Sequence, residues 1–392
     1  MEERTNGREK KSETAISVFF KLIFSIVFIA LLIVAPVFFI LTPDKEQSEL
    51  ENRVLAQFPV PTISSVTDGS FMRDFETYLA DQFPMRDTVV SSKSYIDRIT
   101  GKKEINNVFI GKEGYLFEMP SKVDVEQLDK ITHAIKTFAD KYERINTAVA
   151  IAPNATYVLG DKLPSGVEFE SQADQLLKIK SMIDSEHYTW IDCLSPIERI
   201  KDSTQVYYRT DHHWTTRGAY SAFEAIASAW NFDTSKAGYK FFCVSDSFQG
   251  TLASSSGLND ITDIVEICVP YKSGEGCIVE YESQHLKTAT LFDKNKLLQK
   301  NHYEVFMGGN FDKIVISTDV DTTNALLIVK DSYANCMIPM FTPYFSKIIV
   351  IDPRYFNDNI NGIMQDYDLS HMLFLYNVDT FLEDNSLADV LE

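Results

Sequence analysis

The feature that most constrains this chain is a run of twenty residues, Leu22–Leu41, that contains no charged side chain. An α-helix of that length spans a hydrocarbon core of about 30 Å. Lys21 closes the N-terminal end and further basic residues precede it, which predicts a cytoplasmic N-terminus and an extracytoplasmic body. No small-x-small cleavage site follows Phe39, so the pattern favours a single-pass membrane anchor over a cleaved signal peptide or a buried core helix.

Composition excludes several classes of protein. The chain has 392 residues, 45% of them hydrophobic and 24% charged, as in an ordinary globular protein. Its formal net charge of -19 repels phosphate backbones, so we expect no nucleic-acid partner. The five cysteines form no CxxC pair, which argues against a metal cluster. Cys268 and Cys277 are close enough in sequence to bridge a hairpin, and spacing alone leaves that disulfide open.

The distribution of apolar and turn residues divides the chain into parts. We expect a cytoplasmic tail at 1–21, the transmembrane anchor at 22–41 and an extracytoplasmic N-terminal segment at 44–120. A single large domain is expected at 121–392. Within it, residues 235–325 are less regular and rich in Ser, Gly, Thr and aromatic residues, which predicts a β-rich or loop-rich insertion.

Helical and strand patterns alternate after residue 120. The predicted helices cover 124–142, 171–185 and 216–230, and the predicted strands cover 147–152, 187–191, 325–329, 347–351 and 371–376. Short, fully apolar strands separated by helices are typical of a parallel sheet covered on both faces, so the fold class is α/β. In such sheets the chemistry lies in loops at the carboxyl ends of the strands.

Ser332 follows one of these predicted strands. A serine on a tight turn between a strand and a helix is exposed, and the helix N-terminus that follows can stabilise an oxyanion. The competing interpretation is an N-cap, a position that serine commonly occupies. The surrounding residues do not form a GxSxG elbow, so Ser332 taken alone is a weak signal.

The most unusual stretch contains Asp211, His212 and His213. Asp211 and His213 are two residues apart, so an extended backbone points both side chains the same way. A carboxylate beside an imidazole fixes its tautomer and suits it for general-base work on a serine. A metal site is the alternative, but adjacent histidines on a strand face opposite sides. We therefore predict no metal and no cofactor; a merely structural histidine beside a turn Asp stays open.

Several motifs in matching order resemble the DHHW family. They are TDHHWT at 210–215, ENRVL at 51–55, DQFPMR at 81–86, GKEGYLF at 111–117 and KDSY at 330–333. That family is similar to the alginate O-acetyltransferase proteins, whose SGNH-hydrolase-like domains use a Ser–His–Asp triad. The resemblance runs from about residue 45 to near the C-terminus. It implies an SGNH-like fold in which the order of the sequence blocks is circularly permuted.

Transferred position by position, the resemblance assigns roles to three residues. Asp211 corresponds to the orienting acid, His213 to the base and Ser332 to the nucleophile, while His212 falls at the variable position. Asn377 resembles an oxyanion-hole asparagine, with a turn asparagine as the alternative.

Further residues are expected at the same rim. Arg354 follows the next strand and would bind a substrate carboxylate or sugar, unless it is simply solvated. Trp214 and Tyr333 are candidate sugar-binding aromatics. The Gly of the second sequence block of ordinary SGNH hydrolases is not evident, which weakens the case for an oxyanion hole.

The function implied by the resemblance is O-acetyl transfer to, or acetyl removal from, a cell-envelope or secreted polysaccharide. Because acetyl-CoA is cytoplasmic, the resemblance also implies a membrane-bound O-acyltransferase partner that supplies acetyl groups. The alternative is an anchored polysaccharide-binding or assembly protein that keeps the fold without turnover. A surviving triad would favour the enzyme, and loss of the oxyanion donors would favour the binding protein.

Overall fold

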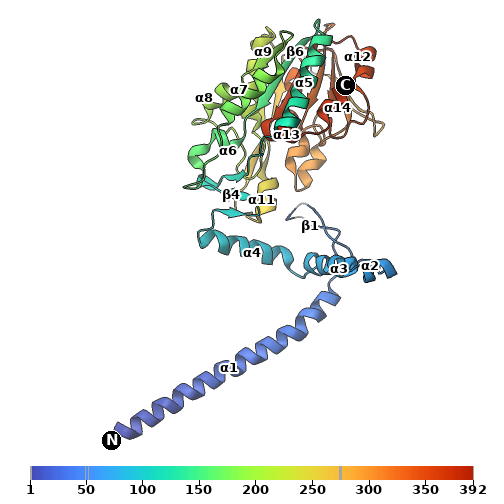
Figure 1. Ribbon diagram of the computed structural model, residues 1–392. Coiled ribbons are helices and arrows are strands. Elements are labelled where there is room, and N and C mark those ends of the chain that lie inside the picture. Colours follow the sequence, from blue (N-terminus) through green and yellow to red (C-terminus); the bar gives the residue numbers. More distant parts are fainter. Residues whose placement is uncertain (1, 49, 52, 273–275, 392) are drawn as a thin grey trace. The chain divides into compact units, whose positions relative to one another are not determined.

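We describe a computed structural model of the chain, which covers residues 2–391 except 49, 52 and 273–275. The contacts divide the chain into two units, Met1–Lys93 and Ser94–Glu392. Each unit is described by itself (Figure 1).

The first unit begins with one long helix, α1 (Glu2–Leu41). Its segment Val18–Leu41 is the part of the described chain that is long and apolar enough to cross a membrane, and none of the window that defines it is buried. A signal sequence passes the same test. Short elements follow: β1 (Gln47–Ser48), β2 (Arg53–Val54), α2 (Ile63–Thr67), α3 (Ser70–Asp81) and α4 (Arg86–Ile99), the last of which crosses the boundary between the units.

The second unit is built on a mixed, mostly parallel sheet. In the described residues its strands are ordered β11–β10–β12–β14–β13–β15–β6–β7. The parallel strands are β14 (Lys347–Ile351), β13 (Ala325–Lys330), β15 (His371–Asn377), β6 (Asn146–Ala152) and β7 (Tyr188–Ile191). All five were predicted from their apolar runs to within one or two residues, and the predicted α/β class is confirmed.

The antiparallel edge of this sheet comes from the segment that lacks regular periodicity. It consists of β10 (Cys277–Tyr281), β11 (Leu286–Thr288) and β12 (Lys313–Thr318). A separate hairpin pairs β8 (Tyr239–Phe248) with β9 (Asp263–Pro270). Cys268 lies in that hairpin and Cys277 in the main sheet; all five cysteines are described and are free thiols.

Helices cover both faces of the sheet (Figure 1). One face packs beneath α5 (Val125–Lys141), α7 (Gln172–Ile183), α12 (Ile360–Asp366), α13 (Val378–Glu383) and α14 (Leu387–Leu391). The other packs against α6 (Ala155–Val158), α8 (Leu194–Ile200) and α9 (Thr216–Ala229). Successive strand residues alternate between the two cores, as Val149 and Ala150 do, because side chains of a strand point to opposite faces.

The remaining described elements are short. They are β3 (Glu104–Ile105), β4 (Val108–Ile110), β5 (Leu116–Glu118), α10 (Thr234–Ala237), α11 (Thr251–Ser256) and the 3₁₀ turns η1 (Lys112–Gly114), η2 (Gly160–Lys162), η3 (Lys294–Leu298), η4 (His302–Val305), η5 (Ser332–Ala334) and η6 (Ile338–Phe341).

His371, at the start of β15, gives the fold a predictable acid sensitivity. It is only 7% exposed and its ring packs against Trp230, Phe232 and Phe345. Burial lowers its pKa to about 4. In the unfolded chain His371 binds a proton as the pH falls below about 6.5, whereas in the folded chain it stays unprotonated until the pH nears 4. The free energy of unfolding therefore falls as the pH drops from 6.5 toward 4.

We expect His371→Phe to reduce this loss by about 1–2 kcal/mol between pH 7 and pH 5. The measurement is urea unfolding of the full chain in detergent at both pH values, followed by tryptophan fluorescence. His133→Gln, at an exposed position on α5, is the control and keeps the wild-type dependence. Equal pH dependence in all three proteins would contradict the assignment.

Candidate active site

Ser332 lies just past the carboxyl end of β13, at the first residue of η5. Every residue of β13 is buried, whereas Ser332 is partly exposed. The N-cap of the turn is Asp331, whose carboxylate accepts the N–H of Tyr333 at 2.9 Å and that of Asn377 at 2.8 Å. Asp331 thus ties the turn to the end of the neighbouring strand β15 and leaves the hydroxyl of Ser332 free of any capping role.

Asp211, His213 and Ser332 form a continuous chain of hydrogen bonds. Ser332 Oγ lies 2.8 Å from His213 Nε2, and His213 Nδ1 lies 2.5 Å from Asp211 Oδ1. The other carboxylate oxygen of Asp211 accepts bonds from Thr251 N at 2.9 Å and Thr251 Oγ1 at 3.1 Å. Because Asp211 accepts the Nδ1 proton, Nε2 of the neutral ring is left to accept the proton of the serine hydroxyl.

Asp263, the first residue of β9, binds the loop that carries Asp211 and His213. This buried carboxylate accepts bonds from the N–H groups of Arg209 and Thr210, from the Thr210 hydroxyl and from the Gln205 amide, at distances from 2.7 to 3.0 Å. The loop closes on itself through an isolated bridge between Tyr207 and Trp214. The triad acid and base therefore lie on a backbone fixed at several points.

Tyr303, in η4, holds the base against the nucleophile. Its ring stacks on that of His213 with centroids 3.9 Å apart and an interplanar angle of 17°. Its hydroxyl donates to the carbonyl oxygen of Ser332 at 3.0 Å. Sequence reasoning missed Tyr303, Thr251 and Asp263, because all three come from the segment 235–325, where no period or motif marks them.

The electrostatics of the site keep Asp211 ionised. Burial alone favours the neutral acid, but the adjacent imidazoles of His212 and His213 and the hydrogen bonds outweigh it, so the pKa of Asp211 lies far below its usual value. Burial, and then repulsion by His213, lowers the pKa of His212 to about 4. At neutral pH His212 is therefore uncharged and does not compete with His213 for an ion pair with the carboxylate of Asp211.

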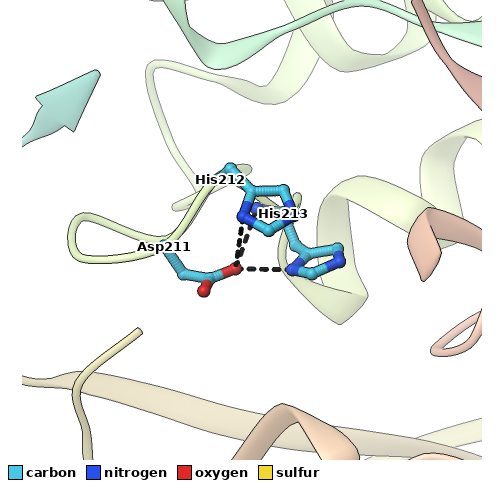
Figure 2. A group of neighbouring side chains, drawn as sticks. All are labelled: Asp211, His212 and His213. Atoms are coloured by element: carbon cyan, nitrogen blue, oxygen red, sulfur yellow. Dashed lines mark hydrogen bonds and ion pairs between the residues drawn. The ribbon is translucent and has the colours of Figure 1, made fainter. Parts of the chain in front are cut away.

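Figure 2 shows the rings of His212 and His213 on the same side of the loop, both directed toward Asp211. Their centroids are 4.0 Å apart, and ligand atoms of the three residues lie within 4.8 Å of one another. The expectation that the two histidines face opposite sides is wrong, because residues 209–213 form a series of bends rather than a strand. A metal ion here would compete for the His213 and Asp211 atoms that make the triad hydrogen bonds.

Trp214 and Tyr333 are buried and contact protein groups. The indole N–H of Trp214 donates to the carbonyl oxygen of Tyr333 at 2.8 Å, and the Tyr333 hydroxyl donates to the carbonyl oxygen of His212. These bonds join the loop that carries the base to the turn that carries the nucleophile. A sugar-binding role for the two rings stays a prediction.

Asn377 and Arg354 also lie at the carboxyl ends of strands. The Asn377 side chain caps α13 by accepting the N–H of Asp379 at 2.9 Å, and its amide hydrogens are directed to Asn154 Oδ1 at 2.5 Å and Ala152 O at 3.5 Å. Arg354 makes a two-pronged ion pair with buried Asp352. Roles in oxyanion or substrate binding stay predictions for both residues.

The chain matches a known family over part of its length. Residues 108–296 match the family described as "SGNH hydrolase-like domain, acetyltransferase AlgX". These residues include Asp211 and His213 and end before Ser332. A probable alginate O-acetylase AlgJ from Pseudomonas syringae pv. tomato is 25% identical over 187 residues, which cover 45% of this chain and 47% of that protein. The match thus spans about half the length of this relative.

Solved structures match over a larger share of the chain. A DHHW family protein from Eubacterium siraeum superposes with a TM-score of 0.62 at 21% identity, covering 74% of this chain and 95% of that one. Bacillus cereus PatB1 with a sulfonyl adduct superposes with a TM-score of 0.59 at 19% identity, covering 72% and 99%. At these identities the likeness shows the fold. Residues 108–296 therefore match the SGNH hydrolase-like domain of the acetyltransferase AlgX family, and the fold of the chain is that of a DHHW family protein.

Proposed function

We propose that this chain is a membrane-anchored O-acetyltransferase or acetylesterase that acts on a cell-envelope or secreted polysaccharide through Ser332, His213 and Asp211. The observation that carries the proposal is the unbroken hydrogen-bond chain from Ser332 Oγ through both nitrogens of His213 to Asp211. The family match and the homology to an alginate O-acetylase support the same chemistry.

In the first half-reaction Ser332 Oγ attacks the carbonyl carbon of the acetyl donor while its proton passes to His213 Nε2. The ionised Asp211 stabilises the imidazolium that forms. When the tetrahedral intermediate collapses, the bond to the donor oxygen breaks and His213 returns the proton to that oxygen. The enzyme is left with an acetyl ester on Ser332.

In the second half-reaction a hydroxyl group attacks the carbonyl carbon of the acetyl-Ser332 ester while its proton passes to His213 Nε2. The bond between Ser332 Oγ and the acetyl carbon then breaks, and His213 returns the proton to Ser332 Oγ. If the hydroxyl belongs to a sugar the result is transfer, and if it belongs to water the result is hydrolysis. Transfer needs a sugar hydroxyl held closer and better aligned than bulk water, since positioning gives bound reactants a large effective concentration.

The proposed topology places residues 1–21 in the cytoplasm, the segment 22–41 in the membrane and the body, with a catalytic domain at 121–392, outside. The apolar stretch of α1 supports the membrane segment by its length and composition. An acetyl donor outside the membrane must be supplied without cytoplasmic acetyl-CoA. We therefore propose a membrane-bound O-acyltransferase as the partner that delivers it.

The choice between transfer and hydrolysis is tested with the full chain, p-nitrophenyl acetate and short neutral or uronic-acid oligosaccharides. We expect nitrophenol release in every mixture, and acetylated sugar, detected by mass spectrometry, with an acceptor that the site positions. Free acetate as the sole product with every sugar would make the chain an esterase. Nitrophenol release no faster than that of Ser332→Ala would contradict the proposed function and favour the binding protein.

A further inference from the structure

A large apolar pocket lies in the first unit, outside the candidate active site. Its volume is about 760 Å³. Residues from the last turns of the apolar helix line one part, namely Ala35, Pro36, Phe39 and Ile40. Side chains from α3, from the loop after it and from the segment before α2 line the rest, among them Phe58, Phe75, Leu79 and Phe83. The pocket therefore begins on the segment proposed to span the membrane.

Contacts among aromatic rings bind the end of α1 to α3. Phe39 meets Tyr78 edge to face at 5.9 Å, and Phe58 meets the rings of Tyr78 and Phe75 at 5.4 and 5.9 Å. The hydroxyl of Tyr78 donates to the carboxylate of Asp44 at 3.1 Å. Aromatic rings with one polar end are typical of the level where lipid tails meet head groups.

The same unit exposes apolar side chains at high density. Among the described residues, ten large apolar side chains are exposed between positions 54 and 89: Val54, Phe58, Val60, Ile63, Val66, Met72, Leu79, Phe83, Met85 and Val89. In the second unit, which is about eight times longer than that stretch, twelve are exposed. Surfaces that face water seldom concentrate apolar side chains in this way. We therefore expect a non-aqueous partner to contact this surface.

We infer that the pocket and the apolar side chains of α2 and α3 lie in the outer membrane–water interface, where phospholipid acyl chains fill the pocket. The inference rests on the proposed anchor and goes beyond it. Phe39 and Ile40 belong to the segment proposed to span the membrane, where lipid acyl chains surround exposed apolar side chains. The pocket continues that lipid-facing surface onto α3. The segment after the anchor is then a second membrane contact, not a flexible tether.

The inference is tested with the full chain in phosphatidylcholine–phosphatidylglycerol vesicles. Cys243 and Cys277, the two thiols that are not buried, are first replaced by serine. Single cysteines then carry a bimane probe at Met72, on the same helical stripe as Leu79, or at Phe83 in the pocket. We expect lipids with a doxyl group high on the acyl chain to quench both probes severalfold more than aqueous iodide does.

Two further probe positions separate failure of this inference from failure of the anchor. A probe at Phe28, inside the span, is quenched by a deep doxyl group whenever α1 is inserted. A probe at Leu177, exposed on α7 of the second unit, is quenched only by iodide. Lipid quenching at 28 but iodide quenching at 72 and 83 would overturn the interface inference alone. Iodide quenching at all positions would overturn the anchor as well.

A photoreactive lipid identifies the occupant of the pocket. Phosphatidylcholine with a diazirine on its acyl chain is expected to label peptides that contain residues 75–83 in the wild-type chain. Leu79→Trp places a bulky ring in the pocket and is expected to reduce that labelling severalfold, while labelling within α1 is unchanged. Equal labelling in both proteins, or none between 75 and 83, would show that acyl chains do not fill the pocket.

Discussion

Replacing Ser332 with alanine is expected to lower the rate of acetyl-ester hydrolysis by about 10³-fold or more, because the substitution removes the proposed nucleophile, the hydroxyl that donates to His213 Nε2. The substitution removes one oxygen atom from a partly exposed side chain, so we expect the folded chain to keep its thermal stability. Nitrophenol release per folded molecule is the measurement.

His213→Ala is expected to match that loss, and the Ser332→Ala/His213→Ala double variant to lose no more than either single one. Residues that act as one unit give effects that do not add. Ser181→Ala, at an exposed serine on α7, is the control with unchanged activity. Losses that multiply in the double variant would contradict a shared catalytic chain.

Gly250→Ala is expected to lower kcat by about 100-fold although Gly250 takes no part in the chemistry, since small displacements of a catalytic group are costly. A Cβ at this position would lie 2.2 Å from Asp211 Cβ and 2.3 Å from its Oδ2. The carboxylate would have to move away from His213 and from Thr251, which follows Gly250. We expect KM for the ester to change little, because the substitution disturbs the acid and not a substrate contact.

Gly160→Ala is the matched control, since a Cβ at Gly160 would meet nothing within 4 Å. Melting temperatures of both variants show whether a loss of activity follows from unfolding. Wild-type kcat in a folded Gly250→Ala chain would show that Asp211 does not need its observed position.

The central parallel strands of the fold, β14, β13, β15 and β6, were predictable because they are largely apolar. A strand buried on both faces, such as β13 or β15, is a short unbroken run of apolar residues between polar turns. That pattern can be recognised in the sequence even when the partner strands are unknown. The edge formed by β10, β11 and β12 was not predictable in the same way. Those strands are partly exposed and short, so neither the periodicity nor the length of the runs separates them from loops.

The acid, base and nucleophile candidates were predicted from the resemblance of TDHHWT and KDSY to family motifs, because Ser332 taken alone is a weak signal and His213 alone leaves a structural role open. Their supports were not found. Thr251 and Tyr303 reach the triad only through tertiary contacts, and a threonine or tyrosine in an irregular segment carries no local signal. The orientation predicted for His212 was wrong for the same reason. The direction of its side chain depends on how the backbone bends at residues 209–213, and not on the alternation of side chains along a strand.

The central claim is that an acetyl group is carried on Ser332. The most direct measurement is the mass of the full chain quenched at acid pH during turnover of p-nitrophenyl acetate, followed by peptide mapping. The account predicts one added acetyl group on the peptide that contains Ser332, absent from Ser332→Ala and retained longer in His213→Ala if any forms. Turnover by the wild-type chain with no acetyl group at Ser332, or equal turnover by Ser332→Ala, would contradict it.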